Sequence, residues 1–198
     1  MTAERTDLGP LERLLAEQDE PQLDPQEFKQ VFRRHPAGVA VVALRHGGRP
    51  VGFTATSVIS VSAAPPLLAF SLASTSSSWA AVSAAPTLAV SFLADHQDDV
   101  SARFATSGVD RFAAGGWTSL PTGEPVIDGA VSWVRARVVQ RTPVGDSYLV
   151  SLRALSAGTA ATASTAGTTG ATAGPGDAAS PLVYHDRTYH RIGAHTAL

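Results

Sequence analysis

Over most of its length, the chain is a series of short apolar segments separated by turns rich in glycine and proline. Apolar residues recur along residues 131–141 and 147–155 with the alternating spacing that is typical of half-buried strands, and a short turn separates the two segments. Residues 39–44 and 51–57 form a second pair around the turn at residues 46–50. Many short strands with few helices predict a mainly β fold, a barrel with helical additions.

Five more segments have the composition of strands: residues 59–62, 67–72, 88–93, 181–184 and 188–192. Residues 106–128 are rich in glycine, proline and polar side chains, and we expect them to form a long loop with Trp117 packed against the body. Long loops in compact domains are often functional.

Helices are expected around the barrel. Asp24 is suited to N-cap a helix over residues 26–34, in which Phe28, Val31 and Phe32 are expected to face inward. Two shorter helices are expected, one opened by residues 74–78 and ending before Pro86, the other over residues 97–105.

The ends of the chain and one internal segment differ from the rest. Residues 1–24 are expected to be a loosely attached N-terminal arm, in preference to an element that packs on a partner subunit, although residues 8–18 have helical spacing. Residues 157–179 contain mainly Ala, Thr and Gly, so we expect a mobile insertion. The domain itself is expected to cover residues 25–193, followed by a tail at 194–198.

Composition excludes several classes of protein. The net charge is −2 and no block of Lys or Arg occurs, which argues against a nucleic-acid partner. The absence of cysteine excludes a disulfide scaffold, a thiolate metal site and a cysteine nucleophile. No run of about 18 apolar residues is present and the N-terminus does not resemble a signal peptide. We therefore expect a cytoplasmic protein with no membrane partner.

Hydroxyl side chains gather in two places. The first is residues 52–62, GFTATSVISVS, on a predicted strand and its continuation. The second is residues 74–78, where a helix is expected to begin and where hydroxyls and free amides can hold a phosphate without Lys or Arg. Taken alone, each cluster is better explained by structure: small polar residues on a barrel strand in the first case, N-capping by Ser76 or Ser77 in the second.

Taken together, the two clusters resemble the flavin reductase domain family, in which a split β-barrel binds FMN at a dimer interface. Residues 32–42, FRRHPAGVAVV, resemble the family's first helix and strand. Residues 52–72 resemble its Thr/Ser-rich turn, Ser-Val-Ser strand, Pro-Pro break and returning strand. Residues 181–193, PLVYHDRTYHRIG, resemble its closing strand pair. The resemblance implies an FMN-binding split β-barrel with a few peripheral helices.

The resemblance also implies which residues bind the cofactor. The segment that contacts the ribityl chain and phosphate side matches Thr54, Ala55, Thr56 and Ser57, and the strand end that addresses the flavin ring matches Ser71, Leu72 and Ala73. The phosphate-binding turn matches Thr75, Ser76 and Ser78, and a strand lining the pocket matches Ser91, Phe92 and Leu93. His190 matches a histidine near the nicotinamide and is the one catalytic candidate.

The activity that the resemblance implies is reduction of FMN or FAD by NADH or NADPH, in a homodimer that supplies reduced flavin to a monooxygenase. Hydride transfer to a flavin requires positioning of the two rings more than an acid or base, so the lack of an obvious catalytic dyad is compatible with it. Two alternatives stay open. One is a protein that holds FMN tightly and uses it on an organic substrate or stores it, and the other is a barrel that has lost its flavin.

Other chemistries lack their sequence patterns. His185 and His190 lie across a predicted turn but have no third ligand at metal spacing, so no metal site is expected. Gly115 and Gly116 do not follow a strand as a dinucleotide fingerprint does. No Gly-x-Ser-x-Gly sequence is present, which argues against a hydrolase.

Overall fold

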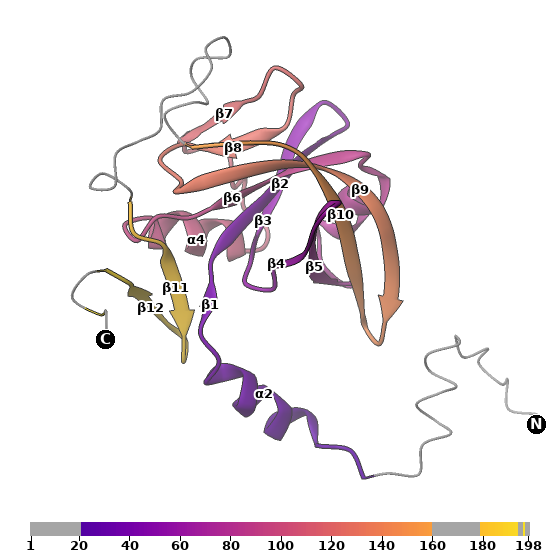
Figure 1. Ribbon diagram of the computed structural model, residues 1–198, viewed down its shortest axis with the longest axis vertical. Helices are drawn as coiled ribbons and strands as arrows, with labels where there is room; N and C mark the ends of the chain where they lie inside the picture. Colours follow the sequence, from indigo (N-terminus) through magenta and orange to yellow (C-terminus); the bar gives the residue numbers. More distant parts are fainter. Residues whose placement is uncertain (1–20, 160–178, 194–195, 197–198) are drawn as a thin grey trace, which may run out of the picture.

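The computed structural model describes residues 21–159, 179–193 and 196 of the chain (Figure 1). The helical spacing at residues 8–18, nearly all of the insertion at 157–179 and most of the tail at 194–198 lie outside these residues. Within the described part, strands dominate and the helices lie around them. No helix in that part combines the length and apolar character needed to cross a bilayer.

Seven strands form the main sheet, and every neighbouring pair in it is antiparallel. In the order of the sheet they are β3 (Arg49–Ala55), β2 (Ala40–His46), β6 (Thr87–Phe92), β9 (Ser132–Val144), β10 (Ser147–Gly158), β5 (Pro66–Ala73) and β4 (Ile59–Ala63). Each of them overlaps a segment that the sequence predicts as a strand. Both predicted hairpins, β2–β3 and β9–β10, are confirmed.

The sheet curls so that distant strands share one interior. Phe53 on β3 and Phe70 on β5 meet there, with ring centroids 5.8 Å apart, and buried side chains of β2, β6, β9 and β10 complete the same core. The edge strands β3 and β4 follow each other in the chain but are not paired with each other, so the barrel is open along this seam. The predicted mainly β, split-barrel architecture is confirmed.

Two small sheets are attached to the barrel. The first contains β1 (Ala37–Gly38), β11 (Leu182–His185) and β12 (Thr188–Arg191), in the order β1-β11-β12. The second is a hairpin of β7 (Trp117–Ser119) and β8 (Pro125–Ile127), inside the segment that we expected to be entirely loop. That expectation is wrong at this point, because strands of three residues are too short to leave a periodic pattern.

Three helices belong to the described part: α2 (Pro25–Arg33), α3 (Trp79–Ala84) and α4 (Asp98–Ala105). Asp24 caps α2 as predicted, because its Oδ1 accepts hydrogen bonds from the backbone N–H groups of Gln26 at 2.6 Å and Glu27 at 3.1 Å. Ser78 is the N-cap residue of α3 but makes no side-chain capping bond, unlike the expected capping by Ser76 or Ser77.

The apolar face of α2 is exposed, which contradicts the expectation that it faces the core. Phe28, Val31 and Phe32 are 51%, 60% and 57% exposed, and no residue of the helix is buried. The helix extends away from the barrel (Figure 1), so none of the described residues covers this face. Helical spacing predicts an apolar face but does not tell which chain will cover it.

A second core lies outside the barrel wall, beneath α4. Phe104 on α4 and Phe112 pack edge to face, with ring centroids 4.9 Å apart, against the outward side of β2 and β3. A Cβ atom at Gly52 on β3 would lie 2.9 Å from the Phe104 ring and 3.0 Å from the Phe112 ring. Glycine is therefore required at this position for the segment after α4 to approach β3, where it forms one wall of a cavity described below.

Candidate functional site

Two hollows that contain polar side chains lie along the outer side of the barrel. The first, which we call the polar groove, encloses about 640 Å³ between α2, the β3–β4 turn, β5 and the β11–β12 turn. Its lining includes Thr56, Ser57, Ser71, Phe32, Arg33 and His185. The groove therefore brings together three of the predicted hydroxyls from two separate strands.

Ser57 holds the chain after β3 against β5. Its Oγ accepts a hydrogen bond from the Ser71 backbone N–H at 3.0 Å and donates one to the Ser71 carbonyl at 3.1 Å. The last backbone pair of β4 and β5 at this end joins Ile59 and Ala69, so the Ser57 side chain extends the pairing beyond it. Ser57 is thus committed to the protein through both of its hydrogen-bonding functions, while Ser71 presents an exposed hydroxyl.

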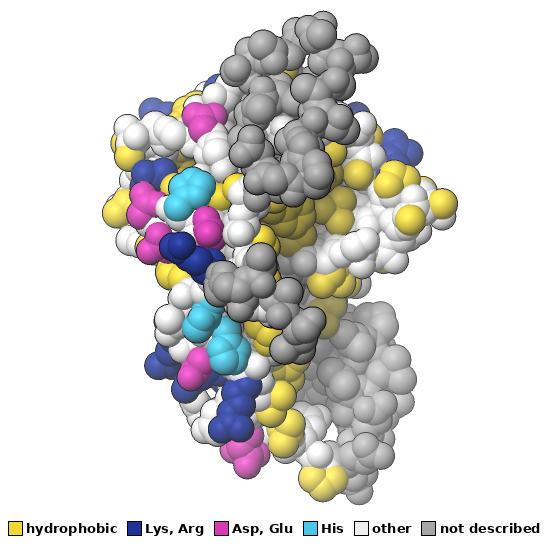
Figure 2. Space-filling view, turned by 60° about the vertical axis from the view of Figure 1, so that its left-hand side comes forward, with side chains coloured by type: hydrophobic (Ala, Val, Ile, Leu, Met, Phe, Trp, Pro, Cys, Tyr) yellow, Lys and Arg dark blue, Asp and Glu magenta, His cyan; other side chains and the backbone are white. Residues whose placement is uncertain are grey.

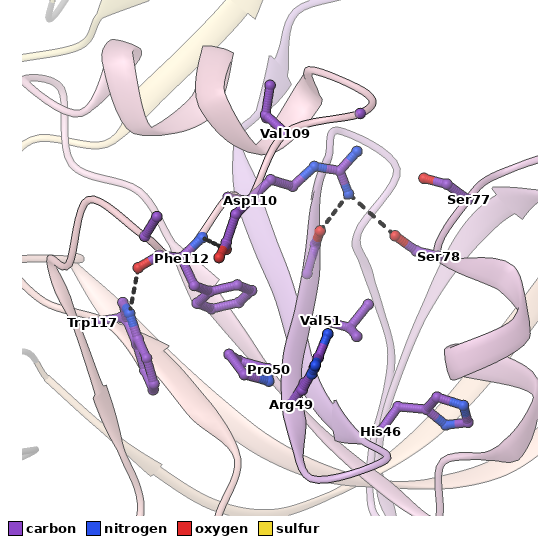
Figure 3. Close-up of a pocket in the computed structure, with 14 residues that line it drawn as sticks. His46, Arg49, Pro50, Val51, Ser77, Ser78, Val109, Asp110, Phe112 and Trp117 are labelled. Carbon is purple, nitrogen blue, oxygen red and sulfur yellow. Dashed lines mark hydrogen bonds between the residues drawn. The ribbon is translucent and has the colours of Figure 1, made fainter.

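The second hollow, which we call the arginine cavity, encloses about 810 Å³ near the opposite end of β3 (Figure 3). Arg49, Pro50 and Val51 contribute one wall, and the loop around Asp110 and Phe112 contributes another. Ser77 and Ser78, just before α3, lie across the cavity from this loop. His46, Gly52, Arg111 and Trp117 also line it.

Arg111 links the walls of the arginine cavity. One nitrogen, Nη1, donates to the Gly52 carbonyl at 2.6 Å and to the Ser78 hydroxyl at 3.3 Å, and Nε donates to the Thr106 carbonyl at 2.9 Å. Burial lowers the pKa of Arg111 from its usual value, because the charged form loses water. Within the described residues no carboxylate pairs with this guanidinium.

The outward face of β3 connects the two hollows. Side chains alternate along a strand, so Gly52 and Thr54 share this face. Gly52 lines the arginine cavity, and Thr56, which directly follows β3, lines the polar groove. Between them, the Thr54 hydroxyl donates a hydrogen bond of 2.6 Å to the Ser101 carbonyl of α4. The first predicted cluster therefore borders both hollows, and its central hydroxyl is already occupied by the protein.

The second predicted cluster borders only the arginine cavity. Ser78 is 2% exposed and accepts the Arg111 hydrogen bond, while Ser76 accepts one at 3.3 Å from the Ser78 backbone N–H. Thr75 is exposed and does not line either hollow. The structure thus separates the hydroxyls of residues 56, 57 and 71 from those of residues 77 and 78, with the face of β3 between them.

The remaining predicted cofactor residues are mostly buried. Ala55 and Leu72 belong to the barrel core and Leu93 to the outer core. The Ser91 hydroxyl accepts a hydrogen bond of 3.0 Å from the Ile127 backbone N–H, which ties β6 to β8. Phe92 borders a third, apolar hollow, and Ala73 is exposed at the end of β5. Flavin contact by these six residues stays a prediction.

Two histidines lie side by side on the β11–β12 hairpin. The rings of His185 and His190 are 5.7 Å apart between centroids, but only His185 lines the polar groove, whereas His190 is exposed beside it. The described residues contain no group of three His, Cys, Asp or Glu side chains that could hold a metal ion. From the sequence, His190 is the catalytic candidate, whereas His185 enters only as a candidate metal ligand.

Sequence reasoning missed the arginines of the second cavity. Arg111 lies in a loop without periodic pattern, and Arg49 is the first residue of β3 after the hairpin turn, so neither carries a local signal for ligand binding. Arg111 becomes notable only when the fold brings it to Gly52 and Ser78, which are 59 and 33 residues away in the chain. No local motif marks Arg111, and only the tertiary structure shows that it lines this cavity.

The open seven-stranded barrel, with hydroxyl-lined hollows on its outer side, places the protein in the class of flavin-binding split β-barrels. The family model described as "Flavin reductase like domain" matches residues 32–193, which is most of the chain. The chain belongs to this family.

Relatives with assigned names agree with the family. The chain is 44% identical over 166 residues to an NADH:FMN oxidoreductase of Rhodococcus erythropolis, covering 83% of this chain and 80% of the relative. It is 34% identical over 129 residues to the reductase subunit of a flavin-dependent monooxygenase of Mycobacterium tuberculosis, covering 65% and 69%.

Solved structures share the fold. A flavin reductase domain protein from Arthrobacter superposes with a TM-score of 0.73 at 30% identity, over 85% of this chain and 95% of that one. An NADH:FAD oxidoreductase from Streptomyces globisporus, solved with NAD and FAD fragments, superposes with a TM-score of 0.75 at 25% identity, over 90% and 100%.

Proposed function

We propose that this protein is an NAD(P)H-dependent flavin reductase that transfers hydride from NADH to FMN. The observation that carries the proposal is the similarity to the Rhodococcus NADH:FMN oxidoreductase, which extends over 83% of the chain at 44% identity. FAD is the second candidate flavin, since the Streptomyces structural neighbour carries FAD fragments. NADPH is the second candidate hydride donor.

The hydroxyl-bearing residues of the polar groove fit a neutral, polar part of a flavin. The exposed Ser71 hydroxyl and the Thr56 side chain offer hydrogen bonds, while Ser57 fixes the distance between the two strands that carry them. The bound flavin would supply the ring that accepts hydride, so the protein has to bind, orient and shield the two reactants. His190, beside the groove on β12, is proposed to orient the nicotinamide.

We propose that two copies of the chain form a homodimer through α2. The side chains of Phe28, Val31 and Phe32 form an exposed apolar face on this helix, and the Phe28 and Phe32 rings contact each other in a tilted arrangement with centroids 4.7 Å apart. Figure 2 shows hydrophobic side chains gathered at the height of α2 in the lower part of the molecule. Phe32 also lines the polar groove, so a copy that covers α2 would border the groove as well.

A monooxygenase is the proposed recipient of the reduced flavin. The support is the similarity to the reductase subunit of the Mycobacterium flavin-dependent monooxygenase. The proposed location is the cytoplasm, where both NADH and free flavin are available to such a pair.

Incubating the purified protein with NADH and free FMN under air, while following the absorbance of NADH, tests the activity. We expect NADH oxidation that depends on the concentration of added FMN, because flavin is a substrate that leaves after reduction. A protein that is yellow as purified and gains nothing from added FMN would instead be a flavoprotein with a permanently bound cofactor. No NADH oxidation under any of these conditions would contradict the proposal.

A further inference from the structure

We propose that the basic end of the polar groove is a docking surface for the acidic N-terminal segment of the same chain, residues 1–20. Bound there, this acidic segment would cover the groove and compete with its ligand. The competition with flavin rests on the proposed function, whereas the contact itself does not. The inference is carried by the unpaired arginines of the groove, the charge of the segment and the reach of the chain.

Two arginines at one end of the groove have no partner for their charge. Arg33, in the last turn of α2, and Arg187, in the β11–β12 turn, both line the groove. Neither guanidinium forms a hydrogen bond or an ion pair with another described residue. Of the described residues that line the groove, only Asp186 is acidic, whereas His35 and His185 add side chains that can become cationic. This end of the groove therefore favours an anionic occupant.

The fold holds the two arginines at the same place. The Asp186 backbone N–H donates a hydrogen bond of 3.0 Å to the Arg33 carbonyl, which ties the β11–β12 turn to the end of α2. Asp186 and Arg187 have φ angles of 47° and 64°, in the left-handed region where glycine is favoured. Backbone strain of this kind is found most often at binding and active sites. The position of Arg187 is therefore better suited to binding than to a plain turn.

The N-terminal segment carries the charge that matches this surface. Residues 1–20 contain six acidic side chains and two arginines, whereas the remainder of the chain contains eleven acidic side chains and thirteen Lys or Arg. The acidic positions are spread along the segment: Glu4, Asp7, Glu12, Glu17, Asp19 and Glu20. The segment and the groove therefore have opposite charge, and complementary charges guide association most strongly at low ionic strength.

The connection is short enough for the acidic segment to return to the groove. Residues 21–24 span at most about 14 Å. The helix α2 adds about 13 Å between Pro25 and Arg33, at roughly 1.5 Å per residue. An extended chain covers the sum of these distances in about eight residues. Positions up to Glu12 can therefore lie at the groove, and Glu4 and Asp7 are among them.

The docked segment would lie over Thr56 and Ser71, the groove residues that we propose to contact flavin. Ion pairs between exposed side chains are individually weak, so we expect partial exclusion of the ligand. Because salt screens exposed charges, this exclusion should disappear at high ionic strength. The acidic segment thus controls how easily a ligand enters the groove.

Paramagnetic NMR on the full chain tests the contact. The chain has no cysteine, so Thr6→Cys carries a single nitroxide label without a change of charge. The labelled protein is compared at about 0.01 M and about 1 M salt, where the screening length falls from roughly 30 Å to roughly 3 Å. We expect the amide signals of Ser57, Ser71 and Asp186 to be broadened at low salt and restored at high salt.

Two double variants of the labelled protein identify the surface that the segment contacts. Arg33→Gln with Arg187→Gln removes the basic pair of the groove and should abolish the broadening. The matched control is Arg137→Gln with Arg153→Gln, because these exposed arginines are paired neighbours on β9 and β10 outside the groove. The control should leave the broadening unchanged.

Riboflavin binding tests the exclusion. Riboflavin is uncharged, so salt acts on the acidic segment and not on the charge of the ligand. The full chain with Glu4→Gln, Asp7→Asn and Glu12→Gln should bind riboflavin roughly threefold more tightly than the wild type at low salt, as expected when a partly occluded site is opened. At high salt the two proteins should bind it equally. Quenching of flavin fluorescence measures both affinities.

The outcomes decide the contact and the exclusion separately. Groove signals without broadening at low salt, or broadening that survives Arg33→Gln with Arg187→Gln, would overturn the docking. Broadening centred on Arg137 and Arg153 would place the segment on another basic surface and contradict it too. Equal riboflavin affinity in the wild type and the triple variant at low salt would overturn the exclusion. A wild type that does not oxidise NADH contradicts the proposed activity, while the NMR result still decides the contact.

Discussion

Ser57 uses one hydroxyl to bind both backbone groups of Ser71, at 3.0 and 3.1 Å. We expect Ser57→Ala to lower the free energy of unfolding by about 1 kcal/mol, because one side chain loses its net contribution to two hydrogen bonds. The same change should weaken flavin binding, since the groove walls are no longer held together. Urea unfolding and a flavin titration check both effects. Ser156→Ala, on an exposed position of β10, is the control, and equal behaviour of the two variants would contradict the role of Ser57.

His190 and His185 offer a test of how the hairpin meets the nicotinamide. We expect His190→Ala to raise KM for NADH roughly fivefold, as loss of one hydrogen bond of about 1 kcal/mol would, and to leave flavin affinity unchanged. Steady-state kinetics with NADH as the varied substrate measure this effect. His96→Ala, which removes an exposed histidine near the start of α4, serves as the control. If only His185→Ala raises KM for NADH, the role belongs to the histidine that lines the groove.

At the scale of elements, the strands were predictable because their signal is local. Alternating apolar positions on β9 and β10, and the two glycines between β2 and β3, define hairpins without reference to the rest of the chain. The β7–β8 hairpin was missed, because its strands are three residues long and its position depends on tertiary contacts such as the Ser91 bond to Ile127. The expectation that the apolar face of α2 packs on the core is wrong for a similar reason. An apolar face indicates burial but not which surface will cover it.

The β7–β8 hairpin is held to the barrel by an ion pair. Arg135 on β9 donates from Nε to the Glu124 carboxylate at 2.9 Å, and the Glu124 side chain is only 4% exposed. Burial alone would raise the pKa of Glu124, but hydrogen bonds from Arg135, Thr122 and Thr87 outweigh it, so the pKa lies below the ordinary 4.5. A lowered pKa means that the carboxylate form stabilises the fold above pH 4.5, and that this contribution is lost as the pH falls through the folded-state value.

We therefore expect Glu124→Gln to reduce the free energy of unfolding at neutral pH by about 1 to 3 kcal/mol, the effect of losing a hydrogen-bonded charge. The difference from the wild type should shrink as the solution is acidified below pH 4.5, where the wild-type side chain becomes neutral too. Denaturant unfolding across this pH range measures it. Asp99→Asn, on an exposed position of α4, provides a change of the same charge. A difference that does not change with pH would contradict the role of the carboxylate charge.

At the scale of the whole molecule, the sequence was sufficient to identify the family but not to predict how the site residues are arranged. The Thr/Ser-rich segment at residues 54–57 could be singled out because its hydroxyl side chains lie close together in the sequence, and two of them, Thr56 and Ser57, line the polar groove. The separation of the two hydroxyl clusters could not be predicted, because it depends on where α4 and the loop after it lie over β3. Arg111 enters the site by the same route, through contacts between residues that are distant in the chain.

The proposed homodimer would form through the face of α2 that the described chain leaves exposed. We expect the wild type to sediment as a dimer, because a helix that exposes Phe28, Val31 and Phe32 buries this apolar surface most readily against a symmetric copy. Val31→Asp places a charge in the middle of that face and should shift the protein to monomers, whereas Gln30→Asp, on an exposed neighbouring position, should not. Since Phe32 also lines the polar groove, the monomeric variant should bind flavin more weakly than the Gln30→Asp control. A wild type that sediments as a monomer, or a Val31→Asp protein that stays dimeric, would show that another surface or no surface joins the copies.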